Sequence, residues 1–429
     1  MAALIFWATL FAMLAIGVPV AFSLAAGGFA IALLVSDLPL RAVVTVFAQN
    51  LYGGVDSFLL LALPLFFFAG SLMEGGGISD RLVRLGLVMI GWVRGGLSMV
   101  AVVTGIFLSG ISGSASSDAA AIGSVLIPAM KKRGYPAGYA SAVAASAGAL
   151  GPIIPPSILL VVYGSIANVS ITKLFLGGIL PGLICAAALI TVCGIIATRR
   201  GYPKEPMPTV TEAKIAFKDA LIPLAGPVIV LGGIFGGIVT ATESAAVAVL
   251  YSLIVSVYVY RTLTWGQVFN IAYESTIASA RVLVIIAAAG FVGWVLAREQ
   301  VPQQIASVFL NLTTDPLILL IIINVIILIF GALMDELALA VILLPTLLPI
   351  LIGADIDLVF FGVVLIVNFA IGTIAPPVGN CLFVVSAVSR TPFEAIVREI
   401  APFILAMVGV LLLLCIFPEI VLWLPNMAG

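Results

Sequence analysis

The sequence predicts an all-α polytopic membrane protein with inverted repeats, each containing a re-entrant helical hairpin and a broken helix. Composition is the first reason. Hydrophobic residues make up 63% of the 429 residues and charged residues only 9%, and a soluble domain cannot bury that much apolar surface. The second reason is that two short patterns each occur twice, in the same order. Internal repetition of this kind indicates a membrane protein assembled from two related halves.

Long apolar segments define the candidate membrane spans. They run over 4–34, 57–73, 137–163, 174–198, 221–240, 244–260, 276–297, 358–385 and 400–424. The first segment lacks a basic flank and a small-residue cleavage site, so we expect a retained helix rather than a signal peptide. Residues 74–95 place three arginines among apolar positions, which predicts an amphipathic helix along the membrane surface.

Two polar tips are flanked by apolar legs that are too short to cross a membrane. Residues 96–111 and 119–130 flank the tip 112–118, and residues 317–331 and 336–350 flank the tip 331–336. A full crossing needs about 20 residues. Re-entrant hairpins therefore explain both segments better than the alternative, ordinary short helices joined by a loop.

The repeated patterns lie in and just after these hairpins. The first is an aspartate followed ten residues later by a proline, in Asp118 with Pro128 and in Asp335 with Pro345. The second is a glycine four residues before a proline pair. Its two copies are Gly151 with Pro155-Pro156 and Gly372 with Pro376-Pro377.

The proline pairs predict that the apolar segments 137–163 and 358–385 are broken helices. Consecutive prolines remove backbone donors and clash with the preceding turn, so neither pair fits a continuous helix. A kink that only shapes packing is the alternative. Transporters build ion sites where a broken helix faces a polar tip. The small or polar residues beside the proline pairs therefore favour a functional break. These residues are Ser157, Thr373, Gly379 and Asn380.

The two aspartates have two possible roles. Ser116, Ser117 and Asp118 precede an alanine-rich run, as N-cap residues do, and could serve only to cap the second leg of the hairpin. Alternatively, the tip lines a site at the membrane midplane, where Asp118 would favour a cation and repel a carboxylate. Asp335 has the same two alternatives. An ionisable group at membrane depth is energetically unfavourable, which favours a functional role.

Charge placement predicts that the two hairpins enter from opposite sides of the membrane. The first hairpin returns to Lys131-Lys132-Arg133, and five further basic residues follow between 199 and 218. Positive charge marks the cytoplasmic side. The ends of the second hairpin, 311–315 and 353–357, contain acidic residues and no basic ones, so this hairpin is expected to open to the outside. Lys173 and Arg298 do not follow this scheme.

Several classes of function are disfavoured. The chain has no histidine, and its four cysteines form no CxxC pair, so neither a disulfide framework nor a metal centre is expected. A net charge of −1 gives no indication of nucleic-acid binding. No HExxH, Ser/His or DxD arrangement is present, which argues against an intramembrane enzyme. The polar segment 240–243 is best explained by helix capping.

In this order, the motifs resemble the large membrane (permease) subunit of tripartite ATP-independent periplasmic (TRAP) transporters. The best matches are segments 111–123, 240–248 and 368–383, and the resemblance covers essentially the whole chain. Two departures are Ala241, where the family often has proline, and Ala375, where threonine is common. The second removes one hydroxyl from the region of the second proline pair.

The resemblance implies a sodium-driven elevator like those of the ion transporter superfamily, in a bacterial inner membrane. Sodium ions would be the coupling ions, and no other cofactor is expected. The implied sodium-site residues are Ser112, Gly113, Ser114, Ser116, Ser117, Asp118, Gly151, Gly331, Met334, Asp335, Gly372, Thr373, Gly379 and Asn380. Substrate would lie between the hairpin tips, near Ser114, Ala115, Pro155, Pro156, Ser157, Pro376 and Pro377.

The implied partners are a small four-helix membrane subunit, a periplasmic binding protein that delivers an organic anion, and the lipid bilayer. The chain itself is expected to hold only the large subunit. A stand-alone carboxylate carrier of the divalent-anion/sodium symporter type, which needs no binding protein, is the alternative.

Repeats and charge together predict five units. These are an N-terminal scaffold with an amphipathic arm, a first transport repeat, a cytoplasmic linker, the scaffold helices of the second half and a second transport repeat. Their predicted bounds are 1–95, 96–198, 199–220, 221–310 and 311–425.

Overall fold

The computed structural model describes residues 2–36, 38–313 and 315–427, with the side chains of 306 and 308–312 left out of that description. Residues 1, 37 and 314, which belong to the predicted units 1–95 and 311–425, lie outside the described residues. The described chain is almost entirely helical, and no β-strand is assigned in it. Seven of its helices are long and apolar enough to cross a membrane. The prediction of an all-α polytopic membrane protein is confirmed.

The N-terminal part contains more helices than the apolar segments predicted. Its elements are α1 (Ala2–Ala15), α2 (Val20–Leu34), α3 (Leu40–Val55), the 3-10 turn η1 (Phe58–Leu61), α4 (Ala62–Gly75) and the amphipathic α5 (Ile78–Ile90). The prediction of one apolar span over 4–34 is wrong. Gly17 adopts φ +85° and Pro19 caps α2, so the chain turns between two shorter helices.

The first repeat contains the predicted hairpin and broken helix. Helices α6 (Gly96–Ser112) and α7 (Ala115–Lys132) are the legs of the hairpin. The broken helix is α8 (Ala137–Gly148) followed by α9 (Ile158–Ala167), with the first proline pair in the gap, and α10 (Ile171–Arg200) completes the repeat.

The middle of the chain is mostly helical. Its elements are α11 (Val210–Phe235), α12 (Ala241–Leu253), the π-helical η2 (Ile254–Val259), α13 (Trp265–Arg298) and α14 (Val301–Leu312). The non-helical part of the predicted linker is only 201–209, because a capping box between Thr209 and Glu212 starts α11. A second capping box joins Thr240 and Glu243, so helix capping accounts for the segment 240–243.

The second repeat has the element order of the first and then adds one short helix at its end. Its elements are α15 (Pro316–Gly331), α16 (Glu336–Gly353), α17 (Leu358–Ile374), α18 (Asn380–Ser389), α19 (Phe393–Ile416) and α20 (Glu419–Met427). Pro418 separates α19 from α20, so the apolar segment 400–424 is two helices and not the single span predicted.

The structure corrects the register of the repeats. Pro155 to Pro376 is a shift of 221 positions, and the same shift superposes the starts of α7 and α16, both 18 residues long. Ser114 therefore corresponds to Asp335. The pairing of Asp118 with Asp335 is wrong by one helical turn, because α16 has prolines at both 345 and 349 and only the second corresponds to Pro128.

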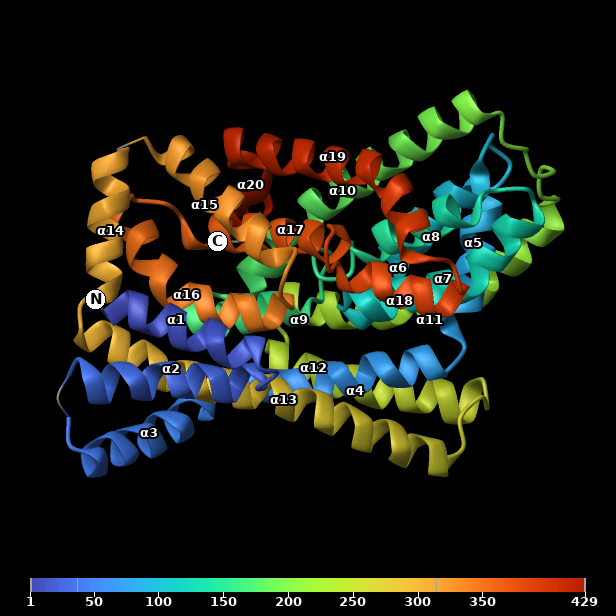
Figure 1. Cartoon of the computed structure of the whole chain (residues 1–429). Helices are drawn as coiled ribbons and strands as arrows, with labels where there is room; N and C mark the ends of the chain where they lie inside the picture. Colours follow the sequence, from blue (N-terminus) through green and yellow to red (C-terminus); the bar gives the residue numbers. More distant parts are fainter. Residues whose placement is uncertain (1, 37, 314, 428–429) are drawn as a thin grey trace.

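The helices form two groups on either side of the molecule. Figure 1 shows α13 running along one side with α2, α3, α4 and α12, and these elements pack against one another. The hairpins and broken helices lie on the other side, and the two repeats interlock there. Helix α9 packs against α16 and α17, whereas α18 packs against α7 and α8. The Tyr163 hydroxyl on α9 donates to the carbonyl of Leu358 at 2.6 Å, which joins the first repeat to the second.

One basic residue at the end of the first hairpin contacts the linker. Arg133 forms an ion pair with Glu205 at 2.8 Å, and Gly95 donates to the carbonyl of Pro203. Figure 1 shows the α10–α11 connection at one end of the molecule and the α14–α15 connection at the other. Thr314 in the acidic segment 311–315 lies outside the described residues, and Asp315 caps α15.

Candidate functional site

The tip of the first hairpin is a two-residue turn pressed against the first helix break. Gly113 ends α6 with φ +61°, and Ser114 takes an extended conformation before α7 begins. A Cβ atom on Gly113 would lie 2.7 Å from the carbonyl oxygen of Pro156. Both the positive φ and this close approach require glycine. The tip and the break thus form one continuous patch of non-helical backbone.

Asp118 is the carboxylate enclosed by this patch. It lies in the first turn of α7, is 1% exposed, and accepts a hydrogen bond from the Ser112 hydroxyl through Oδ1 at 2.5 Å. Its Oδ2 has no hydrogen-bond partner among the described residues. A Cβ on Gly151 would lie 2.8 Å from Oδ2 and 2.8 Å from the Ser114 carbonyl oxygen. A buried charge needs a partner, and the described residues supply none to this oxygen.

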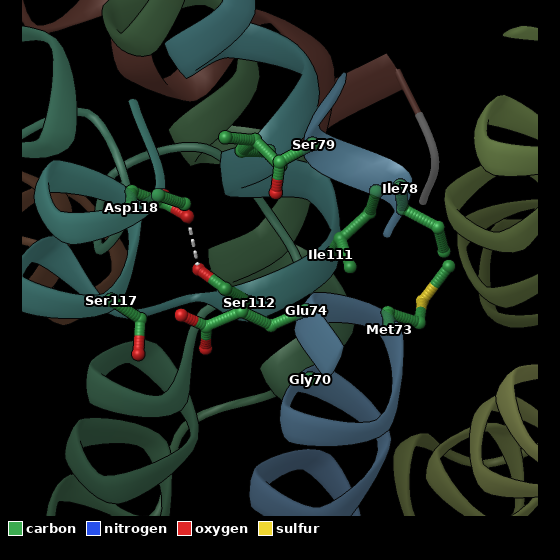
Figure 2. Close-up of a pocket in the computed structure, with 11 residues that line it drawn as sticks. Gly70, Met73, Glu74, Ile78, Ser79, Ile111, Ser112, Ser117 and Asp118 are labelled. Atoms are coloured by element: carbon green, nitrogen blue, oxygen red, sulfur yellow. Dashed lines mark hydrogen bonds between the residues drawn. The ribbon is translucent and has the colours of Figure 1, made fainter. Parts of the chain in front are cut away.

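The tip serines do not all line the same site. The Ser114 and Ser116 hydroxyls lie 3.3 Å apart. Ser117 and Asp118 instead line a small pocket with Glu74 and Ser79 of the α4–α5 region, and Figure 2 shows the Ser112–Asp118 hydrogen bond at its wall. Helix α7 is preceded by Ser114 at the N-cap, with no side-chain cap bond. The capping role considered for Ser116, Ser117 and Asp118 is therefore wrong, because all three already belong to the helix.

The polar residue at the end of the first helix break caps the helix that follows. Pro155-Pro156 has a cis peptide bond, and Ser157 is the N-cap of α9, where its Oγ accepts from the Leu160 amide at 3.3 Å. Ser157 is buried. Ala115, the first residue of α7, is also buried beside Gly148, whose added Cβ would lie 2.7 Å from the Ala115 carbonyl oxygen.

The second tip and break come together in the same way. A Cβ on Gly372 would lie 2.8 Å from the carbonyl oxygen of Gly331, and the Val378 amide donates to the Ala332 carbonyl at 3.2 Å. Pro376-Pro377 is also cis, and Gly379 has φ +56°. Met334 is half-buried. The Thr373 hydroxyl donates to the Ala370 carbonyl within its own helix.

Asp335 is held differently from Asp118. It is the N-cap of α16 and accepts through Oδ1 from the amides of Leu337 and Ala338, at 3.1 and 3.4 Å. Its Oδ2 accepts from Asn380 Nδ2 at 3.3 Å, and the residue is exposed. The capping role is therefore confirmed for Asp335.

A family model matches nearly the whole sequence. The model of the DctM component of the tripartite ATP-independent periplasmic transporter matches residues 7–420. The chain belongs to this family. It is accordingly a multi-pass protein of the bacterial inner membrane, and its relatives are named as transporter permeases rather than enzymes.

Curated relatives of known name support the assignment. The chain is 38% identical to the sialic acid TRAP transporter large permease protein SiaM of Vibrio cholerae, over 96% of this chain and 95% of that protein. It is 36% identical to the C4-dicarboxylate TRAP transporter large permease protein DctM of the same organism, over 97% and 95%. Identity is 42% with the isethionate TRAP transporter permease protein DctMQ of Oleidesulfovibrio alaskensis, but the match spans only 64% of that longer protein.

A solved structure has a related fold. The YdaH transporter of Alcanivorax borkumensis superposes with a TM-score of 0.63 over 89% of this chain and 88% of that one. Sequence identity is 16%, so the likeness concerns the fold alone.

The structure of this TRAP permease also contains polar residues that the sequence patterns missed. Asn368 on α17 is fully buried and donates from Nδ2 to both the backbone oxygen and Oδ1 of Asn324 on α15, at 2.9 and 2.7 Å. The pair ties the second hairpin to the second broken helix. The sequence signal for this pair is a single asparagine in each of two otherwise apolar segments. Glu74 at the end of α4 was missed because it follows a span and looks like an interfacial charge.

Proposed function

We propose that this chain is a sodium-driven permease that takes up an organic anion delivered by a periplasmic binding protein. Membership of a tripartite family supports dependence on a binding protein over the stand-alone symporter alternative. Sodium coupling is supported by Asp118, the observation that carries the proposal. Its Oδ2 is buried without a partner, beside unwound backbone, where a small cation can be held by carbonyl and carboxylate oxygens.

The first sodium ion is assigned to the tip 112–118 and the break after Gly151. Asp118 Oδ2 and the Ser114 carbonyl oxygen flank the same spot above Gly151. The C-terminal end of α6 adds the partial negative charge of its last carbonyls. The Ser112 hydroxyl keeps Asp118 in place through its hydrogen bond to Oδ1.

A second sodium ion is assigned to the corresponding backbone of the second repeat. Gly331 and Gly372 approach each other there, and Asp335 and Asn380 lie beside them. Because Asp335 Oδ1 is engaged by helix amides, carbonyl and amide oxygens contribute most of this site. Met334 of the tip and Thr373 and Gly379 of the helix break belong to the same proposed site.

Substrate is proposed to bind between the two tips, where four helices begin. The start of α7 lies against the start of α9, since a Cβ on Gly113 would be 3.2 Å from the Ile158 amide nitrogen. Asp335 and Asn380 likewise bring the starts of α16 and α18 together. Helix N-termini carry partial positive charge and donate amides to anions. The curated relatives are named for sialic acid, C4-dicarboxylate and isethionate, which are all anionic.

Alternating access is proposed to follow an elevator mechanism, with the interlocked repeats moving against the group that contains α2, α4 and α13. One contact between the two groups involves a glycine. A Cβ on Gly70 of α4 would lie 3.3 Å from the Ser112 Cα. The absence of a side chain on Gly70 lets the tip lie close to α4, and we propose that the tip slides past this point.

The test is uptake into proteoliposomes that contain this chain, its small four-helix membrane subunit and the binding protein. We expect uptake only with an inward sodium gradient and only with loaded binding protein. Equal uptake with potassium replacing sodium would disprove sodium coupling. Uptake that continues without the binding protein would instead support the stand-alone alternative.

A further inference from the structure

A polar pocket lies away from the transport site, where the amphipathic α5 meets α11 and the loop after η2. Arg81 and Arg84 contribute from α5, Lys218 from α11 and Tyr260 from the loop, and the pocket also contains Asp80 and Asp219. Three cations thus face two carboxylates. The excess charge is positive.

The cations of this pocket are not neutralised by ion pairs. In the described chain the two ion pairs are Arg133–Glu205 and Arg200–Glu399, and neither belongs to the pocket. Arg84 and Lys218 are exposed to it. Two basic groups from different helices can therefore approach one anion from two sides.

Arg81 and Tyr260 form a rigid wall of the pocket. The Arg81 guanidinium stacks over the Tyr260 ring with its Cζ 3.5 Å from the ring centroid, and its Nη1 donates to the Gly77 carbonyl at 2.8 Å. The Tyr260 hydroxyl is buried and has no partner in the described part of the chain. This unpaired donor lies beside fixed positive charge, and an anionic oxygen would satisfy it.

The pocket lies beside a lipid-facing surface. Leu221 on α11 is 57% exposed and Tyr258 on η2 is 59% exposed. Leu221 directly precedes Ile222, and Tyr258 lies two residues before Tyr260; Ile222 and Tyr260 both line the pocket. Exposed apolar side chains on spanning helices face acyl chains. Charge placement puts the linker and the start of α11 on the cytoplasmic side. Basic side chains therefore line the pocket and exposed apolar side chains lie beside it. This places the pocket at the depth of the lipid headgroups.

We propose that this pocket binds the phosphate headgroup of an anionic phospholipid of the cytoplasmic leaflet. Basic pockets between membrane helices on that side recognise such headgroups. Because α5 leads into the first hairpin and α11 follows the linker, a bound lipid joins the amphipathic arm before the first transport repeat to the scaffold helices of the second half.

The test is titration of the delipidated chain with phosphatidylglycerol, followed by native mass spectrometry. The double variant Arg84→Gln/Lys218→Gln is expected to bind roughly 25-fold more weakly, at roughly fivefold for each basic group. Tyr260→Phe is expected to weaken binding several-fold. The matched control is Lys214→Gln, an exposed lysine one turn earlier on α11 that does not line the pocket; its affinity should equal that of the wild type.

Three results would overturn the proposal. The double variant could bind phosphatidylglycerol as tightly as the control while showing the same thermal unfolding temperature. The wild type could bind phosphatidylcholine equally well, which would mean that headgroup charge is not recognised. Inorganic phosphate could displace phosphatidylglycerol, which would assign the pocket to a soluble anion instead of a lipid.

Discussion

The two hairpin tips occupy corresponding places in the repeats but use their carboxylates in different ways. Asp335 caps α16 and also accepts from Asn380, so its oxygens are engaged at an exposed position. Asp118 lies one turn inside α7, is 1% exposed and keeps Oδ2 without a partner in the described chain. Equivalent backbone thus supports two different electrostatic environments. At the first tip one carboxylate oxygen has no partner among the described residues, whereas at the second tip both oxygens accept hydrogen bonds.

The largest effect is expected for Asp118→Asn, which keeps the size of the side chain and removes its charge. A contact to a charged group contributes about 1.5–3 kcal/mol, so half-saturation by sodium should rise on the order of 10- to 100-fold. Uptake measured against sodium concentration gives this value. If the sodium concentration for half-maximal uptake is unchanged in a normally folded variant, Asp118 has only a structural role.

A smaller loss is expected for Gly151→Ala. The new Cβ would lie 2.8 Å from both Asp118 Oδ2 and the Ser114 carbonyl oxygen, and overpacking of this kind costs about 1–3 kcal/mol. Sodium-dependent uptake should fall on the order of tenfold. Gly232→Ala is the matched control, because no atom lies within 4 Å of its added Cβ. Equal loss in both variants would mean that glycine flexibility, and not the crowded site, is responsible.

Asn380→Ala tests the second tip. It removes the 3.3 Å contact to Asp335 Oδ2, and one hydrogen bond contributes about 1 kcal/mol, so sodium half-saturation should rise by roughly fivefold. Ser114→Ala, at the corresponding first tip, should weaken sodium dependence by a similar factor. If sodium titration of uptake is unchanged in both variants, these polar side chains only support the fold.

The smallest effect is expected for Asp335→Asn. Asparagine caps helices about as well as aspartate, and the carboxylate of Asp335 is already engaged by amides. Uptake and its sodium dependence should stay within about twofold of the wild type. A loss as large as that of Asp118→Asn would remove the distinction between the two tips.

The sequence predicted the repeated architecture well because prolines and glycines impose local geometry. The proline pairs lie outside helices as expected, and Gly151 and Gly372 both lie where tip and break touch. The hairpin legs 96–111 and 317–331 agree closely with α6 and α15. Whether these hairpins stop part-way through the membrane, and whether the repeats are inverted, stays a prediction.

The role of each carboxylate could not be predicted from spacing alone. Helix α16 has prolines at 345 and 349, so a ten-residue spacing matched the wrong one and made Asp118 and Asp335 look equivalent. The true N-cap, Ser114, depends on where Gly113 turns the chain against Pro156. That contact joins residues distant in sequence, and no local pattern encodes it. The Asn324–Asn368 pair was missed for the same reason.

The most direct test of the central claim is sodium-dependent stabilisation of the purified chain, measured as the unfolding temperature in sodium relative to potassium. Ligand that binds only the folded state raises this temperature. We expect sodium to stabilise the wild type and Asp335→Asn to similar extents and to stabilise Asp118→Asn clearly less, through the second site alone. Full stabilisation of Asp118→Asn, together with its loss in Asp335→Asn, would contradict the assignment of the charged sodium site to the first hairpin.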